Sequence, residues 1–294
     1  MFGLSTMKKI TIALGKTPIS VKFLNSGFAR NTCKHQAIEP IHHAFKRMSE
    51  NVAFDVSEMA IVTAMQAVDH GRDIVPLPIT VASRVQHKCI IQNANFTALG
   101  PKDLEGKTVA VRAYSQTTGA WVRAILETEF DVDCKKITWV TQNPPHVVDA
   151  AEPSNVLRDK NGKSTLEQIE SGLVAAAIFG NDLPEEPWVK PVIENADEIG
   201  RASLEKLGLV QINHVIAVSR SLFEKNPGMI KSLFEQFRFA RETLSKDEQK
   251  MLPIGINDMN FSIETLAQSA FNQNLITKKL STRDIFGEAE KLLK

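Results

Sequence analysis

A run of hydroxyl and amide side chains between two predicted elements is the best candidate for binding an anion. Its members are Tyr114, Ser115, Gln116, Thr117, Thr118 and Gly119. Residues 108–113 before it are apolar and β-branched, which predicts a buried strand. Residues 120–130 after it have apolar side chains at helical spacing. Because the first N–H groups of a helix lack partners inside the helix and carry partial positive charge, this turn is suited to an anion.

The alternative is that a serine or threonine in this turn only caps the helix. The turn is not a phosphate-binding loop of the G-x-x-x-x-G-K-[ST] type, because it has no lysine and too few glycines. A carboxylate is therefore at least as suitable a ligand as a phosphate.

Three charged or titratable residues are candidates for catalysis, each with a structural alternative. Arg84 is suited to a bidentate pair with a carboxylate, and the alternative is a surface salt bridge. His87 can donate a proton near neutral pH, and the alternative is a structural histidine. Glu58 can bind a ligand hydroxyl or act as a base, and the alternative is a pair with a nearby arginine or lysine.

Other polar residues lie at the ends of predicted strands, where ligands bind in open α/β sheets. Those that we take as candidate ligand-binding residues are Ser57, Asn181, Asp182 and His214. Asp55, Glu58 and Asp182 are acidic, but they show no recognised metal spacing, so no metal is expected. No other cofactor motif is visible either.

The predicted elements alternate between strands and helices from the start of the chain. Strands are predicted at 9–14, 53–59, 74–82, 108–113, 137–140 and 174–179, with helices between several of them. This alternation predicts the α/β class with mostly parallel sheets. Pro76 and Pro78 indicate an irregular or edge position for the strand at 74–82.

The composition argues against a nucleic-acid-binding protein and against a membrane-spanning protein. The chain has 294 residues, 43% of them apolar and 23% charged, with a formal net charge of +1. We therefore expect no nucleic-acid partner, and no stretch reaches the ~20 apolar residues of a membrane span. The apolar run at 10–14 is too short for the core of a signal peptide, and the three cysteines lie far apart. These features predict a cytoplasmic protein.

Two longer segments resemble the type II periplasmic-binding-protein fold: DLEGKTVAV at 103–111 and NHVIAVSRSLFEKNPGMIKSLFEQF at 213–237. The resemblance implies an α/β protein with two lobes, joined by two crossing strands, and a ligand cleft between the lobes. Residues 1–90 and 213–294 are then expected to form the first lobe. Residues 91–212 are expected to form the second lobe, which carries the anion-binding helix start.

A narrower likeness comes from FDVSEM at 54–59, SRVQH at 83–87 and YSQTTGAWVRAIL at 114–126. These segments resemble the 4,5-dihydroxyphthalate decarboxylase group. The likeness implies that Ser57 and Glu58 reach the cleft from the first lobe. It also implies that Arg84 and His87 lie near the first crossing.

Two functions follow from this likeness. The first is a cofactor-independent decarboxylase of a hydroxylated aromatic, phthalate-like carboxylate. In it Arg84 and the helix start hold carboxylates, His87 is the acid, and Glu58 holds or deprotonates a ring hydroxyl. The alternative is a non-catalytic substrate-binding protein, similar to the solute receptor of an ABC transporter, for a small carboxylate. The expected partner is a small anionic ligand in either case, and a homodimer stays an open alternative for the assembly.

Overall fold

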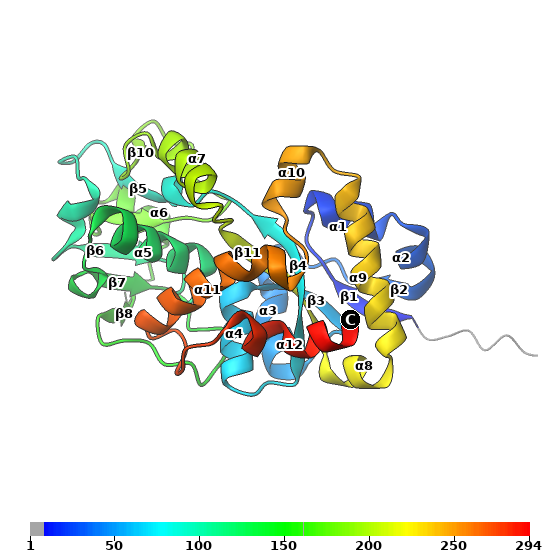
Figure 1. Ribbon diagram of the computed structural model, residues 1–294. Helices are drawn as coiled ribbons and strands as arrows, with labels where there is room; N and C mark the ends of the chain where they lie inside the picture. Colours follow the sequence, from blue (N-terminus) through cyan, green and yellow to red (C-terminus); the bar gives the residue numbers. More distant parts are fainter. Residues whose placement is uncertain (1–8, 161) are drawn as a thin grey trace, which may run out of the picture. The chain divides into compact units, whose positions relative to one another are not determined.

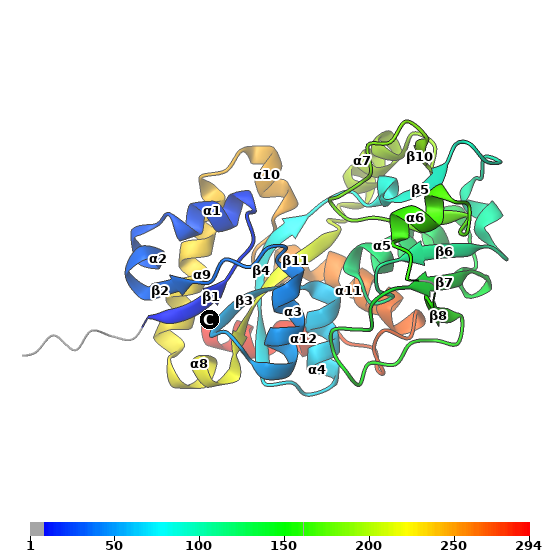
Figure 2. The same cartoon turned by 180° about the vertical axis from the view of Figure 1, so that it is seen from behind.

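The computed structural model describes residues 9–160 and 162–294, shown from two sides in Figures 1 and 2. The chain divides into two compact units. Unit 1 comprises the residues up to Ser83 together with Ile212–Asn260 and Ser281–Lys294. Unit 2 comprises Arg84–Gln211 and Phe261–Leu280.

Unit 1 is built on a five-stranded sheet of order β2-β1-β3-β11-β4. Its strands are β1 (Ile10–Ala13), β2 (Cys33–His35), β3 (Val56–Ala60), β4 (Ile74–Ser83) and β11 (Ile212–Ser219). Strand β1 runs parallel to β2 and β3, whereas β11 runs antiparallel to β3 and β4. Strand β4 is at the edge of the sheet, as Pro76 and Pro78 predict, because a proline cannot donate to a ladder.

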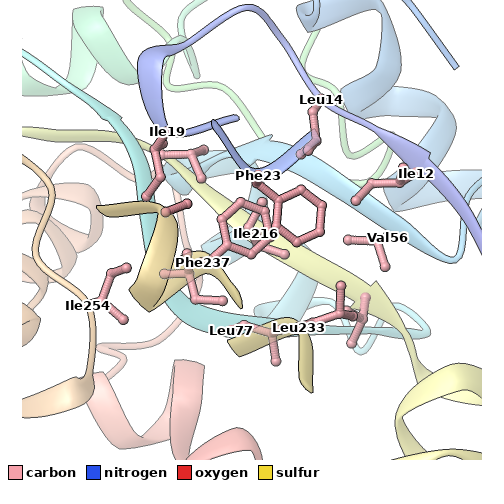
Figure 3. Packing of buried hydrophobic residues seen from close by; sticks show 14 of the residues in the cluster. Ile12, Leu14, Ile19, Phe23, Val56, Leu77, Ile216, Leu233, Phe237 and Ile254 are labelled. Carbon is pink, nitrogen blue, oxygen red and sulfur yellow. The ribbon is translucent and has the colours of Figure 1, made fainter. Parts of the chain in front are cut away.

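Helices cover this sheet and share its hydrophobic core. They are α1 (Pro18–Leu24), α2 (Gly27–Thr32), α3 (His42–Asn51), α4 (Ile61–Asp69), α8 (Arg220–Lys225), α9 (Pro227–Glu242), α10 (Lys246–Met251) and α12 (Thr282–Leu293). Figure 3 shows Phe23 of α1 against Phe237 of α9, where the two rings stack with centroids 4.1 Å apart. Both side chains are fully buried, so they join these helices to the strands beneath.

Unit 2 has its own six-stranded sheet of order β10-β5-β9-β6-β7-β8. Its strands are β5 (Ile90–Asn93), β6 (Thr108–Val111), β7 (Thr138–Thr141), β8 (Val156–Arg158), β9 (Ala176–Ile178) and β10 (Val189–Pro191). Strands β9, β6, β7 and β8 are parallel, so their carboxyl ends meet at one edge. The helices are α5 (Thr117–Phe130), α6 (Thr165–Glu170) and α7 (Ala196–Leu207), with short 3-10 turns at η1 (His87–Cys89), η2 (Pro101–Leu104) and η3 (Cys134–Lys136).

The structure divides the chain differently from the expected lobes at two places. It assigns the segment from Arg84 to unit 2, and it adds residues 261–280 to that unit. These residues include most of α11 (Ile256–Asn272). The hydrogen bonds of Gln273 connect this segment to unit 2. Gln273 accepts a hydrogen bond from Arg123 Nε at 2.7 Å, and its Nε2 donates to the Ala120 carbonyl at 3.0 Å. Apolar spacing predicts a helix here, but it does not say which sheet the helix packs against.

None of the helices among the described residues combines the length and the apolar character needed to cross a bilayer.

Candidate functional site

Helix α5 begins without a side-chain cap, directly after strand β6. Gln116 is its N-cap residue and makes no capping hydrogen bond with its side chain. The first turn is buried, with Thr117 3% and Thr118 2% exposed. A Cβ at Gly119 would lie 3.3 Å from Val111 Cγ2, so the glycine lets this turn approach the strand closely. The first N–H groups of the helix therefore lie near the carboxyl end of β6. The N-cap side chain does not accept a hydrogen bond from them, as a capping serine or threonine would.

Arg84, which the likeness placed near the first crossing, contacts this first turn. Its Nη2 donates to Thr118 Oγ1 at 2.8 Å, and its Nη1 donates to Asn181 Oδ1. Burial lowers the pKa of Arg84, and the nearby Cys89 and Asp182 partly oppose this effect. The guanidinium stays charged because even a lowered arginine pKa lies far above neutrality. It is therefore a fixed, partly desolvated cation beside the helix start.

Three of the predicted polar groups meet around Gly180, which follows strand β9. A Cβ on this glycine would lie 3.4 Å from Asp182 Oδ1, 3.6 Å from Arg84 Nη2 and 3.6 Å from Gln116 Nε2. The amide oxygen of Gln116 is buried and finds no hydrogen-bond partner among the described residues. The structure thus brings together Arg84, Gln116, Thr118, Asn181 and Asp182 within unit 2.

A groove of about 510 Å³ begins at this cluster, and it contains a residue that the sequence analysis missed. Arg112, Gln116 and Asp182 line it together with Gln142 and the apolar side chains of Ile178 and Phe179. Burial also lowers the pKa of Arg112, and Asp182 again opposes the effect. The expected strand at 108–113 included Arg112, whereas β6 ends at Val111. An arginine in the first position after a parallel strand is the signal that would have identified it.

Tyr114 and Ser115 differ from the cluster residues in what surrounds them. The Tyr114 ring packs under the Arg123 guanidinium at 3.9 Å, and its hydroxyl donates to the Gln273 carbonyl at 3.2 Å. Burial raises the pKa of Tyr114. Ser115 is 3% exposed. The tyrosine side chain therefore belongs to the interior of unit 2.

His87 lies at the other end of α5 from Arg84. Its Nε2 is 3.0 Å from Glu129 Oε2, in the last turn of the helix. Residues 117 and 129 are twelve apart, which is about 18 Å along a helix axis. The imidazole is fully buried, and its Nδ1 finds no partner among the described residues. The structure thus does not bring His87 to the cluster where it was expected to act as an acid.

Glu58, Ser57 and His214 belong to unit 1 and form a separate group. Glu58 Oε1 lies 2.6 Å from His214 Nδ1, and its Oε2 accepts from the Gly15 backbone N–H at 2.8 Å. The Glu58 side chain is 1% exposed. Ser57 donates its hydroxyl to the Glu58 carbonyl at 2.8 Å. Both carboxylate oxygens of Glu58 thus contact protein groups. The structural alternative for Glu58 was a pair with an arginine or lysine, and the side chain that it contacts is a histidine.

The cysteines offer no activated thiol. Cys33, Cys89 and Cys134 are free and buried, and burial raises the pKa of each. Since the thiolate is the reactive form, none of them should react with a thiol reagent in the folded protein at neutral pH. We expect native protein to resist the reagent and denatured protein to react at all three positions. Rapid labelling of any cysteine in the native protein would contradict this expectation.

Within residues 9–160 and 162–294, no group of three or more histidine, cysteine, aspartate or glutamate side chains is placed to hold a metal ion.

Comparison with known proteins gives matches to solved structures alone. No family model matches the chain, and no curated protein matches it. The periplasmic aliphatic sulphonate binding protein SsuA from Escherichia coli matches with a TM-score of 0.59 at 13% identity, over 95% of this chain and 99% of that one. The desulfurization enzyme DSZB matches with a TM-score of 0.57 at 13% identity, over 97% and 99%. The CA3427 gene product of Candida albicans, described as having the generic periplasmic binding protein fold, matches with 0.54 at 11% identity, over 98% and 96%.

These matches correct the prediction of a cytoplasmic location. That prediction is contradicted by this comparison, because solved structures of the same fold include two that are described as periplasmic binding proteins. The structures named above do not show the likeness to the decarboxylase group. The fold prediction is confirmed: the chain has the α/β type II periplasmic-binding-protein fold.

Proposed function

We propose that this protein is a non-catalytic binding protein for a small organic oxyanion, a carboxylate or a sulfonate. The oxyanion binds at the start of α5, where the first helical N–H groups and the Arg84 guanidinium donate to it. The single observation that carries this proposal is the hydrogen bond from Arg84 to Thr118, which fixes a partly buried cation at an uncapped helix start. Solved structures of the same fold include proteins described as sulfonate-binding, which supports an oxyanion ligand.

The arrangement of the acids supports binding over decarboxylation. Loss of carbon dioxide from an aromatic ring requires a proton donor at the ring carbon. His87 was given that role, yet its imidazole contacts Glu129 at the end of α5, away from Arg84. Glu58, the other candidate, is already engaged by His214 and Gly15. We therefore place the alternative function, capture without turnover, first.

The test is a titration of the full chain with a panel of sulfonates and carboxylates, including methanesulfonate and benzoate. For any acid that binds, Arg84→Gln should weaken the affinity by roughly 10- to 150-fold, because it removes a charge-assisted hydrogen bond worth about 1.5–3 kcal/mol. The matched control is Arg201→Gln on α7, which removes an exposed arginine of the same unit and should leave the affinity unchanged.

Two results would contradict the proposal. One is an affinity that is the same in wild type and Arg84→Gln for a confirmed anionic ligand. The other is release of carbon dioxide from a carboxylate in the panel, which would restore the enzyme hypothesis.

A further inference from the structure

Arg112 is a partly buried cation with no protein partner at its side chain. No hydrogen bond or ion pair among the described residues engages its guanidinium, although its carbonyl accepts from the Gln142 and Asn143 backbone N–H groups at 3.2 and 2.8 Å. Among residues 9–160 and 162–294, the charge that acts noticeably on it is that of Asp182, which is exposed and also acts on Arg84. Removing a guanidinium from water without a partner costs free energy, so this group is poised for an acceptor from outside the protein.

Gln142 supplies a second unpaired donor in the same groove. It follows strand β7, and its Oε1 accepts a hydrogen bond from Thr165 Oγ1 at 2.9 Å. Its Nε2 is shielded from solvent and has no acceptor among the described residues. Buried amide groups are normally paired, because an unpaired one loses its hydration without compensation. Arg112 and Gln142 are joined through their backbones, and each has a side-chain donor without an acceptor among the described residues, while the Gln142 oxygen is already engaged by Thr165.

The walls between these donors and the Arg84 cluster are partly apolar. Leu166, Ile178, Phe179 and Pro184 line the groove alongside the polar residues. Ligand sites of this kind combine apolar walls with a few placed polar groups that fix orientation. A ligand held by one acidic group at Arg84 would lay a hydrocarbon body on these walls and reach Arg112 with its far end.

We propose that Arg112 and Gln142 form a second subsite, which binds a second acidic group of the ligand. The ligand class is then an organic acid with two acidic groups on an apolar body. This inference rests on the proposed function, because the first acidic group binds at Arg84. The charges are compatible with it: Arg84, Arg112 and the start of α5 are positive, against the single carboxylate of Asp182.

The experiment compares each diacid with the monoacid of the same chain length. The probes are succinate, glutarate, adipate and pimelate, against butyrate, valerate, hexanoate and heptanoate, titrated into the full chain by calorimetry. At the chain length that fits, the diacid should bind about tenfold more tightly than its monoacid, since it adds a charge-assisted contact. Arg112→Met should abolish this advantage, and it should weaken the binding of the diacid much more than that of the monoacid. Gln142→Glu should reverse the advantage, because it puts a carboxylate beside the second acidic group.

The possible outcomes distinguish a failure of the second subsite from a failure of the proposed function. If Arg84→Gln weakens all of the acids while diacids and monoacids bind wild type equally, the second subsite is overturned and the proposed function stands. The same conclusion follows if Arg112→Met weakens both series equally. If neither series binds wild type and Arg84→Gln changes nothing, both proposals fall. Arg201→Met serves as the charge control, and a thermal melt of each variant confirms that it is folded.

Discussion

Replacing Glu58 with leucine should lower the free energy of unfolding of unit 1 by about 3 kcal/mol or more. The carboxylate makes two contacts that leucine cannot make, one to the Gly15 N–H and one to His214 Nδ1. Each is a hydrogen bond to a charged group, worth about 1.5–3 kcal/mol. The loss leaves the Gly15 N–H without its partner at the end of β1. His214 keeps some contact with water, at 21% exposure, so the loss of its partner costs less than it would for a fully buried polar group.

Glu58→Gln separates the role of shape from the role of charge. Glutamine keeps an acceptor for Gly15 and fits the same space, so it should cost about 1 kcal/mol, the value of an ordinary hydrogen bond. Glu39→Gln is the exposed control in the same unit: its partner is Lys16, and surface pairs contribute roughly 0–1 kcal/mol. Chemical denaturation of the three variants measures these differences. If Glu58→Leu is as stable as wild type, the carboxylate is not a structural anchor and becomes available again for a ligand.

The sequence predicts well what depends on local patterns. Apolar and β-branched runs predicted β1, β3, β6 and β9 to within a few residues, because alternation and run length are properties of the strand itself. The role of the turn before α5 as an anion site, inferred from its place between strand and helix, stays a prediction. The polar residues near Gly180 were predicted in the same way, since the carboxyl ends of parallel strands meet at one edge.

What the sequence does not predict depends on the direction of side chains. Arg84 and His87 are three residues apart, yet one contacts the first turn of α5 and the other its last turn. A 3-10 turn begins at His87, and such short turns have no strong sequence pattern. Arg112 was overlooked because the predicted strand at 108–113 included it, whereas β6 ends one residue before it. Residues 261–280 join unit 2 through the hydrogen bond between Gln273 and Arg123. These two residues are about 150 positions apart in the sequence, so no local pattern predicts their contact.

The position of His87 leads to the second large effect, at Gly200 of α7. A Cβ on this glycine would lie 2.1 Å from Val85 Cγ1 and 2.8 Å from His87 Nδ1. Glu129 holds the His87 ring from the other side, so the ring has no room to move away. Gly200→Ala should therefore force α7 outward at a cost of about 3 kcal/mol, the upper end for overpacked cores. Alanine returns roughly 1 kcal/mol of helix propensity, which leaves a net loss of about 2 kcal/mol.

The matched control is Gly287→Ala, another glycine inside a helix. Its Cβ would meet only Arg283 Cβ, at 3.7 Å, an ordinary contact. With no clash to offset the gain in propensity, this variant should be about 0.5–1 kcal/mol more stable than wild type. Thermal or denaturant unfolding of the two variants should thus give changes of opposite sign. A stabilised Gly200→Ala protein would mean that α7 is not packed on His87. The histidine would then be free to turn toward a ligand, and its assignment as an acid would have to be reconsidered.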